Sequence, residues 1–145
     1  MSENQIKEVT LILLKSKLHL LLSFENTVAA KIKFLHWNYK NENFIGIHQL
    51  LNSQYNTVTE FIDLIAEKIR IICDCPIETT SLNLQFDENT EISLETIIQD
   101  YEKCNEEITS ILNLSNINKY QGCVNMLSSI IDKQETLVYL LKNNL

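Results

Sequence analysis

The first 37 residues of the chain carry a hydrophobic pattern with helical spacing. Over residues 4–37, apolar side chains recur every three or four positions, and further leucines and isoleucines form a second apolar face. The pattern therefore predicts one long helix that is buried on more than one side. The main stripe comprises Ile6, Val9, Leu13, Leu20, Phe24, Val28 and Leu35.

After a polar break at residues 38–43, a second apolar stripe begins. It comprises Ile47, Leu51, Tyr55, Val58, Ile62, Ile65, Ile69 and Ile72. Its steps of three and four residues predict a helix of about 28 residues that ends before Pro76, because the residue before a proline disfavours helical geometry.

The second half of the chain predicts two more helices behind a long connection. Residues 76–90 have no sustained period, which indicates a crossover with room for one short helical turn at residues 82–86. Ser93 is placed to cap a third helix, and a fourth follows a loop at residues 113–118. The apolar positions of these helices are Leu94, Ile97, Ile98, Tyr101, Ile108 and Leu112, then Cys123, Leu127, Ile130, Leu137 and Leu141.

Four helices with one long crossover between the second and third have the connectivity of ferritin-like bundles. The predicted fold class is therefore an all-α, ferritin-like four-helix bundle, in a single domain over residues 1–145. Composition agrees, because the chain has only Gly46, Gly122 and Pro76 where a sheet protein needs many turn residues.

Charge and cysteine content limit the partners and the compartment. The net charge is −7, so attraction to nucleic-acid phosphates is not expected and cations are the expected small partners. Cys73 and Cys75 have C-x-C spacing rather than the C-x-x-C of redox or zinc sites. We interpret them, with Cys104 and Cys123, as structural thiols, and leave a redox role of the first two open.

The leucine-rich segment at residues 11–22 does not predict a targeting or membrane segment. Lys15, Lys17 and His19 interrupt it, and no small-residue cleavage site follows. No segment reaches the roughly 18 apolar residues that a membrane span needs. We therefore expect a cytoplasmic protein with reduced thiols and no membrane association.

A polar stripe runs along the second predicted helix beside its apolar one. It comprises His48, Asn52, Asn56, Thr59, Asp63 and Glu67, again at helical spacing. A solvated face would explain the stripe, but an imidazole at one end and two carboxylates at the other are ligands suited to iron. His48 and Asp63 lie roughly 22 Å apart along a helix, so they cannot share a metal within one chain.

Two copies of this helix would bring the two ends of the stripe together. If they cross antiparallel about a two-fold axis near Asn56, the histidine end of one lies against the carboxylate end of the other. Each of two equivalent sites then receives His48 from one subunit and Asp63 and Glu67 from its mate. His36, at the end of the first helix, could fold over to the same place, which gives two imidazoles and two carboxylates around an iron or an iron pair.

Short segments around the stripe stand in a distinctive order. They are His36-Trp37-Asn38, Asn43-Phe44, His48, and Asp63-Leu64-Ile65-Ala66-Glu67-Lys68-Ile69-Arg70. This pattern resembles the signature of the Dps family, the twelve-subunit mini-ferritins. The resemblance is strong over residues 31–72 and elsewhere rests on the helix plan.

The resemblance implies a ferroxidase that stores iron. His36 and His48 of one subunit and Asp63 and Glu67 of its two-fold mate would bind iron(II), with Trp37 beside the site. Iron(II) would be oxidised, commonly by hydrogen peroxide, and iron(III) mineralised inside a hollow homododecamer built from two-fold dimers. Such a protein limits oxidative stress, and iron is its substrate and cargo, with no organic cofactor.

The chain also departs from the family pattern. Asn52 stands where many members carry an aspartate, so the second iron position is expected to be weak. The start of the last helix, at residues 119–125, lacks the aspartates that line the family's iron-entry pore. Twelve subunits at −7 each would carry −84, so no direct binding to duplex DNA is expected.

These departures keep an alternative open. The chain could be a Dps-like shell scaffold with weak or lost ferroxidase activity that acts through its surface or binds another metal, such as zinc or manganese. An unrelated helical interaction module would treat the carboxylates as a solvated charge run, but it leaves the His36-Trp37-Asn38 segment without an account.

Overall fold

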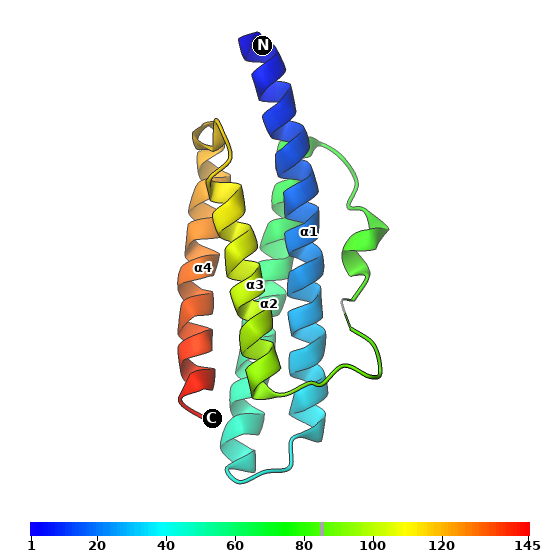
Figure 1. Cartoon of the computed structure of the whole chain (residues 1–145), viewed down its shortest axis with the longest axis vertical. Coiled ribbons are helices and arrows are strands. Elements are labelled where there is room, and N and C mark those ends of the chain that lie inside the picture. The colour runs from blue at the N-terminus through cyan, green and yellow to red at the C-terminus, as the bar shows by residue number, and fades with distance from the viewer. Residues whose placement is uncertain (85) are drawn as a thin grey trace.

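Four long helices form a bundle in the computed structural model, which describes residues 1–84 and 86–145 (Figure 1). The helices are α1 (Glu3–Asn38), α2 (Phe44–Cys73), α3 (Leu94–Leu112) and α4 (Gln121–Lys142), with short 3-10 turns η1 (Thr79–Leu82) and η2 (Ile117–Lys119). No strand occurs among the described residues. The predicted all-α bundle with a long crossover between α2 and α3 is confirmed.

The helix ends follow from local hydrogen bonds. Ser2 caps α1 in a capping box: its hydroxyl accepts from the Gln5 amide at 3.2 Å, and the Gln5 side chain accepts from the Ser2 amide at 2.7 Å. Ser93 caps α3 with Thr96 in the same manner, as predicted. Asp74 takes a left-handed conformation with φ 44° after the last residue of α2, which ends the helix before Pro76.

The buried face of α1 differs from the prediction. Val9, Leu13 and Leu20, which belong to the predicted main stripe, are each 44% exposed. The other apolar face points into the bundle instead, including Leu14, Leu18, Leu21, Leu22 and Ile32. At 36 residues α1 far exceeds the 19 residues of α3, so its first turns extend past the end of the bundle, where neighbouring helices do not cover both faces (Figure 1).

The predicted stripe of α2 holds without such a change. Its members are buried or half-buried against α1 and α4. The polar stripe on the same helix lies on the outer side, where Asn52, Asp63 and Glu67 are exposed. The fold therefore leaves the candidate ligands of α2 accessible.

The crossover from α2 to α3 runs along the outer side of α1 (Figure 1). Its helical turn is η1, which lies earlier than the predicted turn at residues 82–86; of that segment, Gln85 lies outside the described residues. Contacts with α1 place the turn here: Asn26 Nδ2 donates to the Ser81 carbonyl at 3.2 Å, and the Glu78 amide donates to His19. Such tertiary contacts leave no mark in the periodicity.

The middle of the bundle contains a polar layer built by all four helices. The Tyr101 hydroxyl donates to Gln54 Oε1 at 2.9 Å, and Gln54 Nε2 donates to the Leu137 carbonyl at 3.1 Å. Gln134 Nε2 donates to Glu25 Oε1 at 2.7 Å. Glu25 is fully buried, and this desolvation raises its pKa to about 8, although the hydrogen bond from Gln134 opposes the rise. The carboxyl group is therefore mostly neutral at pH 7.

Within the described residues, no helix combines the length and the apolar run that crossing a bilayer requires.

Candidate metal centre

The link between α1 and α2 brings two histidines into contact. His36 lies near the end of α1 and His48 near the start of α2, and both are half-buried. Their rings stack with centroids 3.8 Å apart and planes inclined by 20°. Phe44 packs against the His48 ring at 5.2 Å. The structure thus places the two predicted imidazole ligands side by side.

Each of these rings bonds to the backbone of the other residue. His36 Nδ1 lies 2.9 Å from the His48 carbonyl oxygen, and His48 Nδ1 lies 3.0 Å from the His36 carbonyl oxygen. A carbonyl oxygen can only accept, so both Nδ1 atoms carry the proton and donate it. Both Nε2 atoms then keep a lone pair, which is the form in which histidine binds a metal while its other nitrogen is oriented by a backbone carbonyl.

The stacking limits how the pair can bind. An imidazole lone pair lies in the plane of its ring, and two nearly parallel rings do not aim their lone pairs at a common point. The arrangement therefore suits two ions, one for each imidazole, rather than one ion held by both. Of the two options left open by the sequence, this geometry favours an ion pair.

The predicted carboxylates lie on another part of the same chain. Asp63 and Glu67 are exposed on α2 and, four residues apart, share one face of it. No three His, Cys, Asp or Glu side chains among the described residues gather closely enough to hold a metal. Within one chain, the predicted imidazole and carboxylate ligands therefore lie at two separate places.

Trp37, the residue after His36, lines a groove that also reaches Asp63. A groove of about 510 Å³ between α1 and α2 is lined by Trp37 and Lys33 of α1 and by Tyr55 and Asp63 of α2. Leu84 of the crossover also lines it. Lys33 Nζ lies 4.3 Å from the centre of the Tyr55 ring. Trp37 is 69% exposed, so one wall of this groove is an accessible indole.

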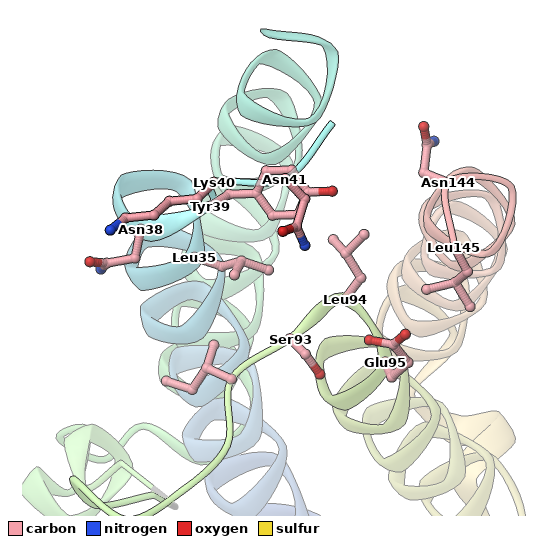
Figure 2. Close-up of a pocket in the computed structure, with 11 residues that line it drawn as sticks. Leu35, Asn38, Tyr39, Lys40, Asn41, Ser93, Leu94, Glu95, Asn144 and Leu145 are labelled. Atoms are coloured by element: carbon pink, nitrogen blue, oxygen red, sulfur yellow. The ribbon is translucent and has the colours of Figure 1, made fainter. Parts of the chain in front are cut away.

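A second hollow, of about 390 Å³, lies at the end of the bundle near the C-terminus (Figure 2). The figure shows it between the link after α1, the first residues of α3 and the last residues of the chain. Its charged side chains are Lys40 and Glu95, and none of the candidate ligands lines it. Its lining does not offer a metal-binding set.

The cysteines are free thiols in the structure. Burial raises the pKa of Cys123 to about 11 and also raises that of Cys73, with the neighbouring Cys75 adding to the latter. These groups are neutral at pH 7, in agreement with their interpretation as structural thiols.

Two buried titratable residues were not among the sequence candidates. Glu25 is the only acidic residue in the buried polar set of the described chain, and His19 is 6% exposed. Both stand in register with buried leucines of α1: Glu25 follows Leu21 by four residues, and His19 precedes Leu22 by three. A charged residue in register with an apolar stripe is the signal that would have identified Glu25.

Comparisons with known proteins agree with this fold. The family model of the ferritin-like domain matches residues 15–145. A fine tangled pili major subunit of Haemophilus ducreyi is 36% identical over 64 residues, which are 44% of this chain and 34% of that protein. An uncharacterised low temperature-induced protein of Nostoc is 25% identical over 123 residues, or 78% of this chain and 69% of that protein. The chain thus spans about a third of the first relative's length.

A shorter match and several solved structures point the same way. A DNA protection during starvation protein of Mycolicibacterium smegmatis is 34% identical over 55 residues, or 38% of this chain and 30% of that protein. The crystal structure of a Dps protein from Vibrio cholerae superposes with a TM-score of 0.81 at 22% identity, over 93% of this chain and 90% of that one. Antigen TpF1 of Treponema pallidum superposes with a TM-score of 0.82 at 19% identity, over 93% of this chain and 92% of that one. At these identities the superpositions establish a shared fold.

Proposed function

The chain belongs to the ferritin-like family and has the fold of Dps proteins, and we propose that it is a mini-ferritin that oxidises iron(II) and stores iron(III). One observation carries the proposal: His36 and His48 are stacked, and each donates its Nδ1 proton to the other's backbone. This arrangement leaves two Nε2 lone pairs for metal, and the exposed carboxylates Asp63 and Glu67 lie on the same chain. A single domain over residues 1–145 is part of the proposal.

A second copy of the chain completes each site. The isologous pairing of α2 with α2 brings the partner's carboxylates to the histidine pair, and the same operation forms a second site. Each site then offers two imidazole nitrogens and two carboxylates, a ligand set for two iron(II) ions in which Glu67 lies between them. The groove lined by Trp37 and Asp63 borders the carboxylate half.

Two ions in one site suit the chemistry of peroxide. Reducing one hydrogen peroxide to two waters takes two electrons and two protons, and two iron(II) ions supply the electrons as they become iron(III). A single ion would deliver one electron and release a hydroxyl radical. The hard carboxylate ligands favour iron(III), which then passes on to the mineral.

The assembly follows from the same pairing. We take the two-fold dimer as the unit of a closed homododecamer whose interior holds the ferric mineral, in the cytoplasm and in protection against oxidative stress. A net charge of −7 per chain opposes direct binding to duplex DNA. Retardation of DNA in a low-salt gel without divalent cations would contradict this part of the proposal.

Asn52 favours a second candidate function. This exposed amide lies four residues after His48, where an acidic ligand would strengthen the second ion position. A chain with too weak a second position would act as a Dps-like scaffold, through its surface or with zinc or manganese in place of iron.

The test is oxidation of iron(II), loaded anaerobically, on addition of hydrogen peroxide, read by ferric absorbance and Trp37 fluorescence. Glu67→Gln removes one ligand charge at constant size and is expected to lower the initial rate by about tenfold or more. Glu60→Gln, on an exposed residue of α2, is the matched control and should keep the wild-type rate. Oxidation no faster than in buffer for the unmodified protein would favour the scaffold.

Mixed assemblies test the site between subunits. His36→Ala and Asp63→Asn chains are each expected to be inactive, but a dimer with one of each has one intact site. Random co-assembly should therefore restore about a quarter of the wild-type activity. A site within one chain predicts no restoration.

A further inference from the structure

His19 holds the crossover to α1 through both of its ring nitrogens. The ring is 6% exposed. Its Nδ1 lies 2.8 Å from the Lys15 carbonyl oxygen, and its Nε2 accepts a hydrogen bond from the Glu78 backbone amide at 3.2 Å. Glu78 immediately precedes η1, so the contact joins one turn of α1 to the start of the crossover's only described helical turn.

The two partners define the protonation state of this ring. The Lys15 carbonyl can only accept, so Nδ1 carries a proton, and the Glu78 amide can only donate, so Nε2 carries a lone pair. His19 is therefore neutral in this structure. A proton added at Nε2 would face the Glu78 N–H, replace a hydrogen bond with a repulsion, and leave a charge in a nearly buried place.

Other contacts between α1 and this end of the crossover do not depend on the His19 ring. Asn26 Nδ2 donates to the Ser81 carbonyl at 3.2 Å, and Lys15 Nζ lies 3.9 Å from Glu78 Oε1. That ion pair is exposed on both sides, at 41% and 53%, so water and salt screen it. Losing the His19 bond thus removes a partly buried hydrogen bond that links α1 directly to the start of the crossover.

The charged groups around His19 do not replace this bond. Lys15 lies on its own helix and Glu78 on the crossover, where they face each other, and the neutral thiol of Cys73 lies near Lys15 at the end of α2. The other side chains that line the hollow around His19 are uncharged. Protonation of His19 therefore acts on the crossover through the Glu78 amide.

We propose that His19 is a pH-sensitive pin that releases the start of the crossover from α1 when its ring is protonated. The crossover continues to Leu84, which lines the groove beside Trp37 and Asp63. Release at acidic pH therefore loosens one wall of that groove. The proposal rests on the His19 contacts and holds whether or not the chain oxidises iron.

Hydrogen–deuterium exchange measured by mass spectrometry tests the pin on the full assembled protein. Amide protection of residues 76–83 is compared at pH 7.5 and pH 5.5 after correction for the intrinsic exchange rate, a range in which histidines change charge. The protection is expected to fall about tenfold at pH 5.5, while that of α3 and α4 does not fall. Equal protection at both pH values in the unmodified protein would overturn the proposal.

Two variants assign the effect to the imidazole. In His19→Gln the amide oxygen can still accept from Glu78 and does not titrate, so the pH response of residues 76–83 should disappear. Lys15→Met removes the ion pair with Glu78 and keeps the histidine, so the response should persist. A response lost in Lys15→Met but kept in His19→Gln would assign it to the ion pair and refute the pin. If His19→Gln does not fold by circular dichroism, the unmodified protein and Lys15→Met still decide the question.

Discussion

Replacing the buried Glu25 with glutamine is expected to stabilise the protein, and more so as the pH rises. Glu25 is fully buried, and this desolvation raises its pKa from 4.5 to about 8, against side-chain hydrogen bonds with Gln134 and Cys104 that lower it. Glutamine keeps the size and the Oε1 acceptor for Gln134, and it removes the ionisable group. The substitution therefore isolates the effect of burying a carboxyl group.

The sign follows from proton linkage. The folded-state pKa lies above the unfolded value, so the contribution of Glu25 is fully present below about pH 4.5 and is lost as the pH rises through about 8. The loss is about 1.4 kcal/mol per pH unit in between, and about 5 kcal/mol over the whole range. At pH 7, ionisation of this group stabilises the unfolded chain by about 3 kcal/mol and lowers the free energy of unfolding by the same amount. The glutamine variant has no such loss.

Chemical denaturation from pH 5 to pH 8.5 measures this difference. Because assembly couples stability to concentration, both proteins are compared at one protein concentration. The stability advantage of Glu25→Gln should grow with pH, whereas Glu60→Gln, on an exposed residue, should show no such growth. An advantage that is equal at pH 5 and pH 8.5 would refute the reasoning, because it would mean that the carboxyl group does not bind its proton more tightly in the folded state.

Two further substitutions test the metal centre and the bundle. Asn52→Asp adds a carboxylate to the polar stripe of α2. In anaerobic titration, it should increase the affinity of the weaker position for iron(II) about tenfold. Asn56→Asp, one turn further on, adds the same charge and serves as the comparison. Lys31→Met breaks the 2.6 Å ion pair with Asp100, whose side chain is 21% exposed, and should cost roughly 2–3 kcal/mol in thermal or chemical denaturation. The double variant Lys31→Met with Asp100→Asn should recover part of that loss of stability. A double variant as unstable as Lys31→Met alone would contradict the buried-charge explanation.

Sequence periodicity predicted the helices well because most of their buried residues recur at the three- and four-residue spacing of a helix. The stripe of α2 and the Ser93 cap of α3 were both found from spacing alone. The main stripe of α1 was wrong at Val9, Leu13 and Leu20 because two apolar faces compete on that helix, and spacing alone does not decide which one is covered. The turn in the crossover was misplaced because its position depends on contacts with α1 that are distant in sequence.

The candidate site divides in the same way. His48, from the polar stripe, and His36, from the end of the first helix, were predicted as ligands, and the structure places the two rings together. Their tautomers could not be read from the sequence, since the bonds that set them go to backbone carbonyls, which every residue has. His19 was missed because it was interpreted as an interruption of the leucine-rich segment rather than as a buried group. Glu25 was missed because its place on a buried face of α1 was not considered.

The backbone bonds of His36 and His48 also bear on how the site responds to its ions. The rings are held before any ion arrives, so the ordering of two side chains is part of folding and does not weaken binding. In the proposed site, an ion on Nε2 would withdraw electron density from the ring and make Nδ1–H a stronger donor to the opposite carbonyl. Metal loading would thereby strengthen the contact between α1 and α2, so occupancy of the site would be transmitted to the backbone of two helices without any side chain changing its partner.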